Sequence, residues 1–526
     1  MTKVNKKSGY DAFWDKMSGF YASNSGIIDR CVVLIIFLVL FGTRLYDISI
    51  KNQVHSDEVF SLMISTGNKY YNSSLPDAVY TGSELKEILS ADDKGGFAGA
   101  ISDIARLWKN NGDAPHASLY YMVLRLALIG YDSFDANELA WRGGLLNLLF
   151  FALSFVIMYR LLRKVLGCNS LLVFAGLALA FGNWLSVKNT LLVREYQMAE
   201  TAILAFTYIG ISLIIALRKR EEINVKKYFV GIALLVAFVM SLGYFNAVYV
   251  GLFGVSILFA AYKYRQKKLI FWLLLSAVAG IAVAYIMYPG FFNFLLHDSV
   301  HKEKAFSSVR NIYGNVVYRD LVMQFFTLPG VILAGIALLA ALMWGDRKQL
   351  LKSGNFAWIS VLVVVAMFVI QYASVLKMPR YYFPIVPLLV LVVLHVFKCL
   401  PKSMKGYFEL LFILYFPVLN VLFPTRVNYR WKNLHSGLTQ DAIIHKLNPN
   451  EVAQIMPCME DSVKYTITSQ DYVDISRSKE TFVVTKLAIG ISNDSIQSMK
   501  RLLWGRHIFL YKFNFIPEEE RNNEGK

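Results

Sequence analysis

Two adjacent carboxylates follow the first long apolar run of the chain. Asp57 and Glu58 belong to the segment His55–Leu62, which continues as an amphipathic helical pattern. A carboxylate at a membrane surface can act as a general base for a hydroxyl group, because partial desolvation raises its pKa and nearby cations lower it. The same residues also suit an ordinary helix start, with Ser56 as the cap and both carboxylates favouring the helix dipole. The sequence leaves both interpretations open.

Four cations stand in two short connections between later apolar runs, on the side that the charge pattern predicts to be external. Lys188 and Arg194 belong to one connection, and Lys377 and Arg380 belong to the other, where Tyr381 follows. An arginine fork binds phosphate oxygens bidentately, so these residues are candidates for holding a phosphate on a lipid. The alternative is that they anchor the helices to ordinary phospholipid headgroups.

Two histidine motifs are weaker candidates. His116 follows Pro115, which is typical of a first helical turn, but an imidazole near the predicted outer surface can also hydrogen-bond a phosphate. His297 and His301 have the spacing of two metal ligands on a helix, without a convincing third ligand. Metal dependence stays open, because a carboxylate pair permits a divalent cation and does not require one.

The composition indicates a membrane protein. Of the 526 residues, 56% are apolar and 17% are charged, and the mean hydropathy is +0.44. Soluble domains carry about 25% charged residues, so an ordinary soluble enzyme and a disordered chain are both excluded. The net charge of +17 does not indicate nucleic acid, because the Lys and Arg residues cluster between apolar runs, as the positive-inside rule predicts for cytoplasmic loops.

We predict an all-α polytopic protein with about eleven transmembrane helices. The N-terminus is placed in the cytoplasm, and every short basic connection then falls on the cytoplasmic side. This arrangement indicates a multi-pass membrane protein. The predicted spans are 27–46, 139–160, 170–187, 196–217, 228–243, 246–262, 269–289, 328–345, 356–375, 382–398 and 406–423.

The charge pattern works only if the moderately apolar stretch 114–131 does not cross the bilayer. We expect it to lie in the outer interface as a juxtamembrane helix within the external loop 48–138. The chain is expected to divide into a transmembrane domain, residues 1–423, and a small extracytoplasmic α/β domain, residues 424–526. In the tail, runs 464–468, 481–486 and 507–515 predict strands, and 493–503 predicts a helix.

These elements, in this order, resemble the membrane glycosyltransferases of the C type (GT-C), in particular the protein mannosyltransferase and aminoarabinose transferase group. The resemblance covers about residues 25–400. The residues that carry it are Asp57-Glu58, His116-Ala-Ser-Leu-Tyr-Tyr121, Arg142, Arg194-Glu-Tyr-Gln-Met198 and Arg380-Tyr-Tyr-Phe-Pro384-Ile-Val-Pro387.

The resemblance implies an inverting transfer of a sugar from a polyprenyl-phosphate carrier to a hydroxyl group on the outer side of the membrane. It makes Asp57 the expected base and Glu58 a supporting residue, and it makes Arg380 and His116 candidates for the donor phosphate. The remaining cations of the two external connections would add positive charge for the leaving phosphate, and Tyr381 belongs to the same motif as Arg380. Ala117 and Ser118 depart from the family pattern, which has two prolines there.

Two other classes are consistent with a polytopic chain. A lipid-linked glycan flippase or another transporter would usually show internal half-repeats and polar breaks near the midplane, and no repeat is evident here. A scaffold or receptor that merely anchors the tail would not need the large loop 48–138. The sequence does not specify the sugar, the acceptor (protein, lipid or glycan) or the oligomeric state.

Overall fold

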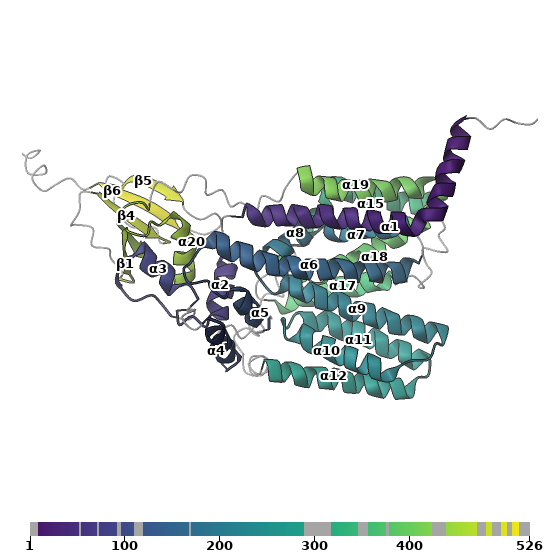
Figure 1. Cartoon of the computed structure of the whole chain (residues 1–526), viewed down its shortest axis with the longest axis horizontal. Helices are drawn as coiled ribbons and strands as arrows, with labels where there is room; N and C mark the ends of the chain where they lie inside the picture. Colours follow the sequence, from purple (N-terminus) through teal and green to yellow (C-terminus); the bar gives the residue numbers. More distant parts are fainter. Residues whose placement is uncertain are drawn as a thin grey trace, which may run out of the picture.

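Long helices lying side by side dominate the structure, a computed structural model, and a small sheet lies beyond one end of the bundle (Figure 1). This end is called the site end below. The structure describes residues 9–51, 54–70, 73–91, 96–109, 119–167, 170–288, 317–345, 356–374, 378–422, 438–470, 480–486, 496–501 and 508–514.

Where the structure describes them, the predicted transmembrane runs fall mostly on α-helices, but the run 382–398 forms short 3-10 helices and a turn before α18 begins at Val390. Among the described residues, six helices are long and apolar enough to cross a membrane, and a bent helix pair would be a seventh, so the chain is a multi-pass membrane protein. The count of eleven stays a prediction. The helices of the bundle are α1 (Gly9–Ser49), α6 (Ala136–Leu166), α7 (Ser170–Phe181), α8 (Trp184–Leu191), α9 (Tyr196–Lys219), α10 (Val225–Met240), α11 (Asn246–Lys263), α12 (Lys267–Met287), α15 (Val317–Trp344), α17 (Trp358–Ala373), α18 (Val390–Cys399) and α19 (Lys402–Leu422).

The predicted span 170–187 is broken into α7 and α8, which meet at 55°. Asn183 stabilises the break, because its amide nitrogen donates to Leu179 O and Ala180 O, both at 2.9 Å, while its oxygen accepts from Ser186 N at 2.9 Å. Asn183 thus satisfies two carbonyl groups at the end of α7 and one N–H group at the start of α8. Lys188 consequently lies on α8 and not in a turn as expected.

The external loop forms four short helices, α2 (Ser56–Ser65), α3 (Gly82–Ile88), α4 (Gly96–Lys109) and α5 (Leu119–Ala127). Helix α5 falls within the predicted interface segment, and its nine residues span about 14 Å, too short to cross a bilayer. It packs against α2 and α4. Arg125 is fully buried and its Nε lies 2.8 Å from Asp103 Oδ2 of α4, so packing and an ion pair hold this helix against α4.

The sheet joins the tail to the external loop. Its strand order is β1-β3-β2-β4-β6-β5, with β2 parallel to both neighbours and the other pairs antiparallel. The strand β1 comes from the loop, and the remaining strands come from the tail together with helix α20 (Pro449–Ile455), which packs against α2. The strands are β1 (Ala78–Thr81), β2 (Ala442–His445), β3 (Lys464–Thr468), β4 (Glu480–Thr485), β5 (Ile496–Arg501) and β6 (Phe509–Asn514).

The predicted strands are confirmed, but the helix predicted over 493–503 is wrong. That segment forms β5, which pairs antiparallel with β6. A short helical pattern yields to a strand when a neighbouring edge can satisfy its backbone hydrogen bonds, because packing and pairing outweigh local propensity. The small mixed sheet expected at the C-terminus is therefore present, with two more tail strands than the pattern predicted, β2 and β5, and a further strand, β1, from the loop.

The short basic connections lie at the end of the bundle opposite to the site end. Helix α9 begins at the site end and finishes at the opposite end with Arg218 and Lys219. Helix α11 runs in the same direction and ends at Lys263 (Figure 1). Helices α10 and α12 start from that opposite end with Lys226, Lys227, Lys267 and Lys268. The described basic connections of α9 to α12 thus share one end of the bundle, away from the site end.

Candidate active site

The carboxylate pair lies at the first turn of α2, at the site end. His55 is the N-cap: its Nδ1 accepts from Asp57 N at 3.2 Å, and Glu58 Oε2 accepts from His55 N at 2.6 Å. This reciprocal capping box places the cap one residue before the expected Ser56. The ordinary helix start and the chemical interpretation therefore hold together, because the cap uses Glu58 and leaves the Asp57 carboxylate for other contacts.

Glu58 is buried and has three partners. Besides capping His55, its Oε1 accepts from Val193 N at 2.8 Å and pairs with the ammonium group of Lys51. The same Lys51 Nζ donates to Leu191 O at 2.7 Å. These contacts tie α2 to the end of α1 and to the connection between α8 and α9. The geometry fits the supporting role expected for Glu58.

Asp57 lies between two guanidinium groups. Its Oδ2 is 2.5 Å from Arg380 Nη1, and Arg194 Nη1 lies 3.4 Å from its backbone oxygen. Burial alone would raise the pKa of Asp57, but the His55 side chain and the cations Arg194 and Arg380 outweigh it and hold this pKa well below its usual range. The carboxylate is thus ionised and strongly stabilised in the structure.

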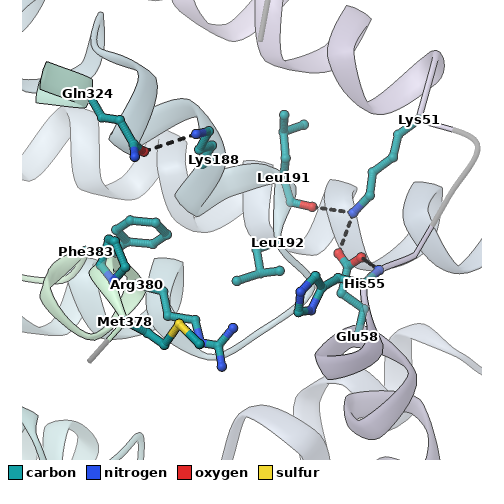
Figure 2. Close-up of a pocket in the computed structure, with 11 residues that line it drawn as sticks. Lys51, His55, Glu58, Lys188, Leu191, Leu192, Gln324, Met378, Arg380 and Phe383 are labelled. Carbon is teal, nitrogen blue, oxygen red and sulfur yellow. Dashed lines mark hydrogen bonds and ion pairs between the residues drawn. The ribbon is translucent and has the colours of Figure 1, made fainter. Parts of the chain in front are cut away.

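A cavity of about 440 Å³, lined by Arg380 and Glu58 among others, opens beside Asp57. Figure 2 shows Arg380 extending from one wall toward His55 at the start of α2, and Lys188 reaching Gln324 of α15 across the opposite part of the cavity, Nζ to Oε1, 3.1 Å. Among the described residues that line it, three cations face one carboxylate. The lining residues are Lys51, His55, Glu58, Lys188, Leu191, Leu192, Gln324, Met378, Pro379, Arg380 and Phe383.

This mixture of cations and apolar side chains suits an amphipathic anion. The cations attract a phosphate, while the leucines, Met378 and Phe383 suit the first isoprene units of a lipid. The lining therefore offers positive charge and apolar surface side by side.

Arg194 and Tyr381 complete the surroundings of Asp57. Arg194 is buried, its Nε lies 3.2 Å from Glu195 Oε2, and its guanidinium lies 5.8 Å from the Tyr121 ring centre. The Tyr381 ring lies 5.7 Å from the Arg380 guanidinium. Burial raises the pKa of the Tyr381 hydroxyl, so it stays protonated and can donate to an anion.

The structure brings together most of the residues singled out in the sequence. Asp57, Glu58, Arg194, Arg380 and Tyr381 lie around one position, and Lys188 lines the same cavity.

Other candidates do not join this group. His116, Lys377, His297 and His301 lie outside the described residues. Arg142 of α6 pairs with Glu138 at 2.5 Å and donates to Ile129 O before this helix, and it is not among the residues that line the cavity.

Sequence reasoning missed three cavity residues: Lys51, His55 and Gln324. Lys51 carried a usable signal, since a cation at the predicted outer end of the first span runs against the positive-inside bias. Gln324 carried none, because a neutral amide near the start of an apolar run is common. In the part of the chain that the structure describes, no three His, Cys, Asp or Glu residues form a metal-binding group.

Comparisons with known proteins add the fold. No protein-family model and no curated protein match the chain. Among solved structures, ArnT from Cupriavidus metallidurans bound to undecaprenyl phosphate is similar, with a TM-score of 0.50 and 11% identity over 93% of this chain and 98% of that chain. The apo state of the same protein gives a TM-score of 0.46 at 11% identity. The chain thus has the GT-C-like fold that its sequence predicted.

Proposed function

We propose that the protein is an inverting glycosyltransferase that moves a sugar from a polyprenyl-phosphate carrier to an acceptor hydroxyl group. The carrying observation is the convergence of the ionised Asp57 with the cations Arg380 and Arg194 beside a half-apolar cavity. The similarity to a fold seen with bound undecaprenyl phosphate supports a polyprenyl carrier. The acceptor is a protein, a lipid or a glycan.

The base in this proposal is Asp57. It takes the proton of the acceptor hydroxyl group as the acceptor oxygen attacks the anomeric carbon from the face opposite to the phosphate. The bond between the anomeric carbon and the phosphate oxygen breaks, and its electron pair leaves on the polyprenyl phosphate. One displacement of this kind inverts the anomeric configuration, and no covalent enzyme intermediate is needed.

The cations stabilise the leaving group. As the bond to the anomeric carbon breaks, negative charge grows on the phosphate, and preorganised donors around it lower the barrier by about 3–4 kcal/mol each. Arg380 and Lys188 line the cavity and are the nearest such donors for a phosphate bound there, with Lys51 at the far wall. The bilayer holds the prenyl tail, which reduces the entropic cost of positioning the sugar.

The charge separation along the bundle supports the sidedness of the reaction. The basic connections at the end opposite to the site fit a cytoplasmic face. The site, the loop helices and the sheet then lie on the outer side of a bacterial inner membrane, with the N-terminus in the cytoplasm. Transfer would accordingly occur outside the cytoplasm.

The test is Asp57→Asn in the full-length protein. We expect sugar transfer to fall by about 10²–10⁴-fold, because proton transfer by a placed base contributes that much. Cells carrying the variant should accumulate the lipid-linked sugar, which mass spectrometry of the lipid fraction detects. Glu138→Gln, which removes a paired carboxylate outside the cavity, is the matched control and should transfer at the wild-type rate.

Two results would contradict the assignment. Near-normal transfer by the Asp57→Asn protein, at wild-type expression, would remove the proposed base. Movement of intact lipid-linked sugar across reconstituted membranes, without cleavage of the sugar phosphate bond, would favour the flippase class instead.

A further inference from the structure

We propose that Arg380 changes partners during the reaction: it holds the Asp57 carboxylate before the donor binds, and it turns to the donor phosphate afterwards, so that donor binding releases the base. This inference rests on the proposed function, because it needs a phosphate-bearing donor in the cavity. It adds an order of events that neither the fold nor the residue types specify.

The contact itself shows that one cation serves two anionic positions. Arg380 Nη1 lies 2.5 Å from Asp57 Oδ2, and the Arg380 side chain, 20% exposed, lines the cavity. A phosphate entering this cavity meets a guanidinium that already neutralises a carboxylate. Two anions on one half-buried cation repel each other, so the carboxylate and the phosphate compete for Arg380.

Buried polar atoms without a hydrogen-bond partner lie where Arg380 would change partners. Among the described residues, the buried Nε of Arg380 has no hydrogen-bond acceptor, and Asp57 Oδ2 has no aligned donor despite the short ion-pair distance. The buried hydroxyl group of Tyr196, which interacts electrostatically with Arg380, is also without a hydrogen-bond partner in this part of the chain. The two buried donors, Arg380 Nε and the Tyr196 hydroxyl group, need an acceptor, and a phosphate oxygen would supply one.

The other groups facing Asp57 explain why the base survives the exchange. His55 lies on its own helix, Arg194 comes from the connection between α8 and α9, and Tyr381 accompanies Arg380. When Arg380 turns away, His55 Nδ1 still lies 3.4 Å from Asp57 Oδ2, and Arg194 still donates to the Asp57 backbone oxygen. Burial then weighs more heavily, and the pKa of Asp57 rises, which makes the carboxylate a stronger base.

Thermodynamic linkage makes the exchange measurable without any sugar transfer. If the Asp57 carboxylate and the phosphate compete for Arg380, each must weaken the interaction of the other with Arg380 by the same factor. The negative charge of Asp57 therefore lowers the affinity for the phosphate. Removing the charge should therefore tighten binding of the lipid phosphate while abolishing catalysis. A residue that only contacts substrate would not show this opposite pair of effects.

The experiment measures binding of a polyprenyl monophosphate to full-length protein in phosphatidylcholine nanodiscs, so that no anionic headgroup competes. The variants are Asp57→Asn, Arg380→Gln, the double variant, and Glu138→Gln as the charge control. We expect Asp57→Asn to bind about five- to tenfold more tightly than wild type, as couplings of this size are typical, and Glu138→Gln to bind as wild type does. Thermal melting confirms that each variant is folded.

The double variant separates competition from a general charge effect. In the Arg380→Gln background, the gain from Asp57→Asn should shrink to less than twofold, because the contested cation is gone. A gain that persists undiminished there, or no gain in Asp57→Asn, overturns the exchange even if the wild type transfers sugar. If no variant binds the polyprenyl phosphate, both the exchange and the proposed donor are wrong.

Discussion

Two polar clusters meet on the short helix α8, and they are built in opposite ways. Lys188 faces the cavity, where cations outnumber carboxylates among the described lining residues. The next residues, Asn189 and Thr190, face the bundle interior, where they join Arg44 of α1 and Glu200 of α9.

In the inner cluster, hydrogen bonds are made within the protein. Arg44 is fully buried and donates to Thr190 Oγ1 at 3.1 Å, to Ser186 Oγ at 2.8 Å and to Phe181 O at 2.7 Å. Glu200 accepts from Asn189 at 2.9 Å and from Gln197 at 2.8 Å. These bonds link α1, α8 and α9 and hold α8 in its position after the bend at Asn183.

The difference teaches how to tell a ligand site from a scaffold in a membrane protein. Ionisable residues inside a membrane domain are functional candidates by default, and both clusters contain them. The charged groups of the inner cluster, Arg44 and Glu200, hydrogen-bond to neighbouring helices, so this cluster positions helices. The cavity cluster has an excess of positive charge and open volume, which suits an anionic ligand.

The largest expected effect comes from the cavity cluster. Arg380→Gln should lower the turnover number of sugar transfer by about 10²–10³-fold, because it removes a charged donor that stabilises the transition state. Transfer from a radiolabelled lipid-linked sugar measures this rate. Arg142→Gln, which breaks an arginine–carboxylate pair outside the cavity, should stay within twofold, and an equal loss in both variants would erase the distinction between the sites.

The inner cluster should respond in stability instead. Arg44→Met leaves buried acceptors without their donor, which costs about 1–3 kcal/mol per lost partner. We expect a clearly lower melting temperature in detergent, with transfer per folded molecule within about threefold of wild type. A variant that melts normally but is inactive would place Arg44 in the chemistry and contradict the comparison.

The pH dependence sharpens the role of the cations around Asp57. Because the pKa of Asp57 is held well below its usual range, the free enzyme keeps its base deprotonated, and kcat/KM should not fall from pH 8 to pH 5 through Asp57. In Arg380→Gln the balance shifts toward burial and the pKa rises, so the residual kcat/KM should fall more steeply toward pH 5. Identical profiles for both proteins would show that Arg380 does not control this carboxylate.

The smallest effect is expected at the edge of the cavity. Lys188 lies on the wall opposite α2 and hydrogen-bonds Gln324, so Lys188→Gln should raise KM for the lipid-linked donor by about three- to tenfold, as loss of one charged hydrogen bond implies. The turnover number should change less. Donor titrations at saturating acceptor separate the two parameters, and a large fall in turnover with constant KM would move Lys188 into the transition state.

Local patterns carried much of the prediction. Apolar runs predicted the bundle helices because a bilayer-spanning helix must satisfy its backbone internally over about 20 apolar residues. Alternating runs predicted three strands of the tail. Both the acidic dipeptide Asp57-Glu58 and the two cationic connections were evident, because charges at the ends of apolar runs are conspicuous.

Long-range packing decided the rest. The tail strand β5 was mistaken for a helix, and β1 was not foreseen, because strand identity there depends on partners elsewhere in the chain. The bend at Asn183, which turns Lys188 toward the cavity, likewise depends on the amide's contacts with both helix ends.

The sequence by itself determined that this is a multi-helix membrane protein with an acidic helix start and basic residues near one face, since both properties follow from neighbouring residues. It could not determine that Glu58 is consumed by a cap and by Lys51 while Asp57 meets Arg380. Which of two adjacent carboxylates remains for chemistry depends on groups brought from distant helices, and only the folded bundle sets those distances.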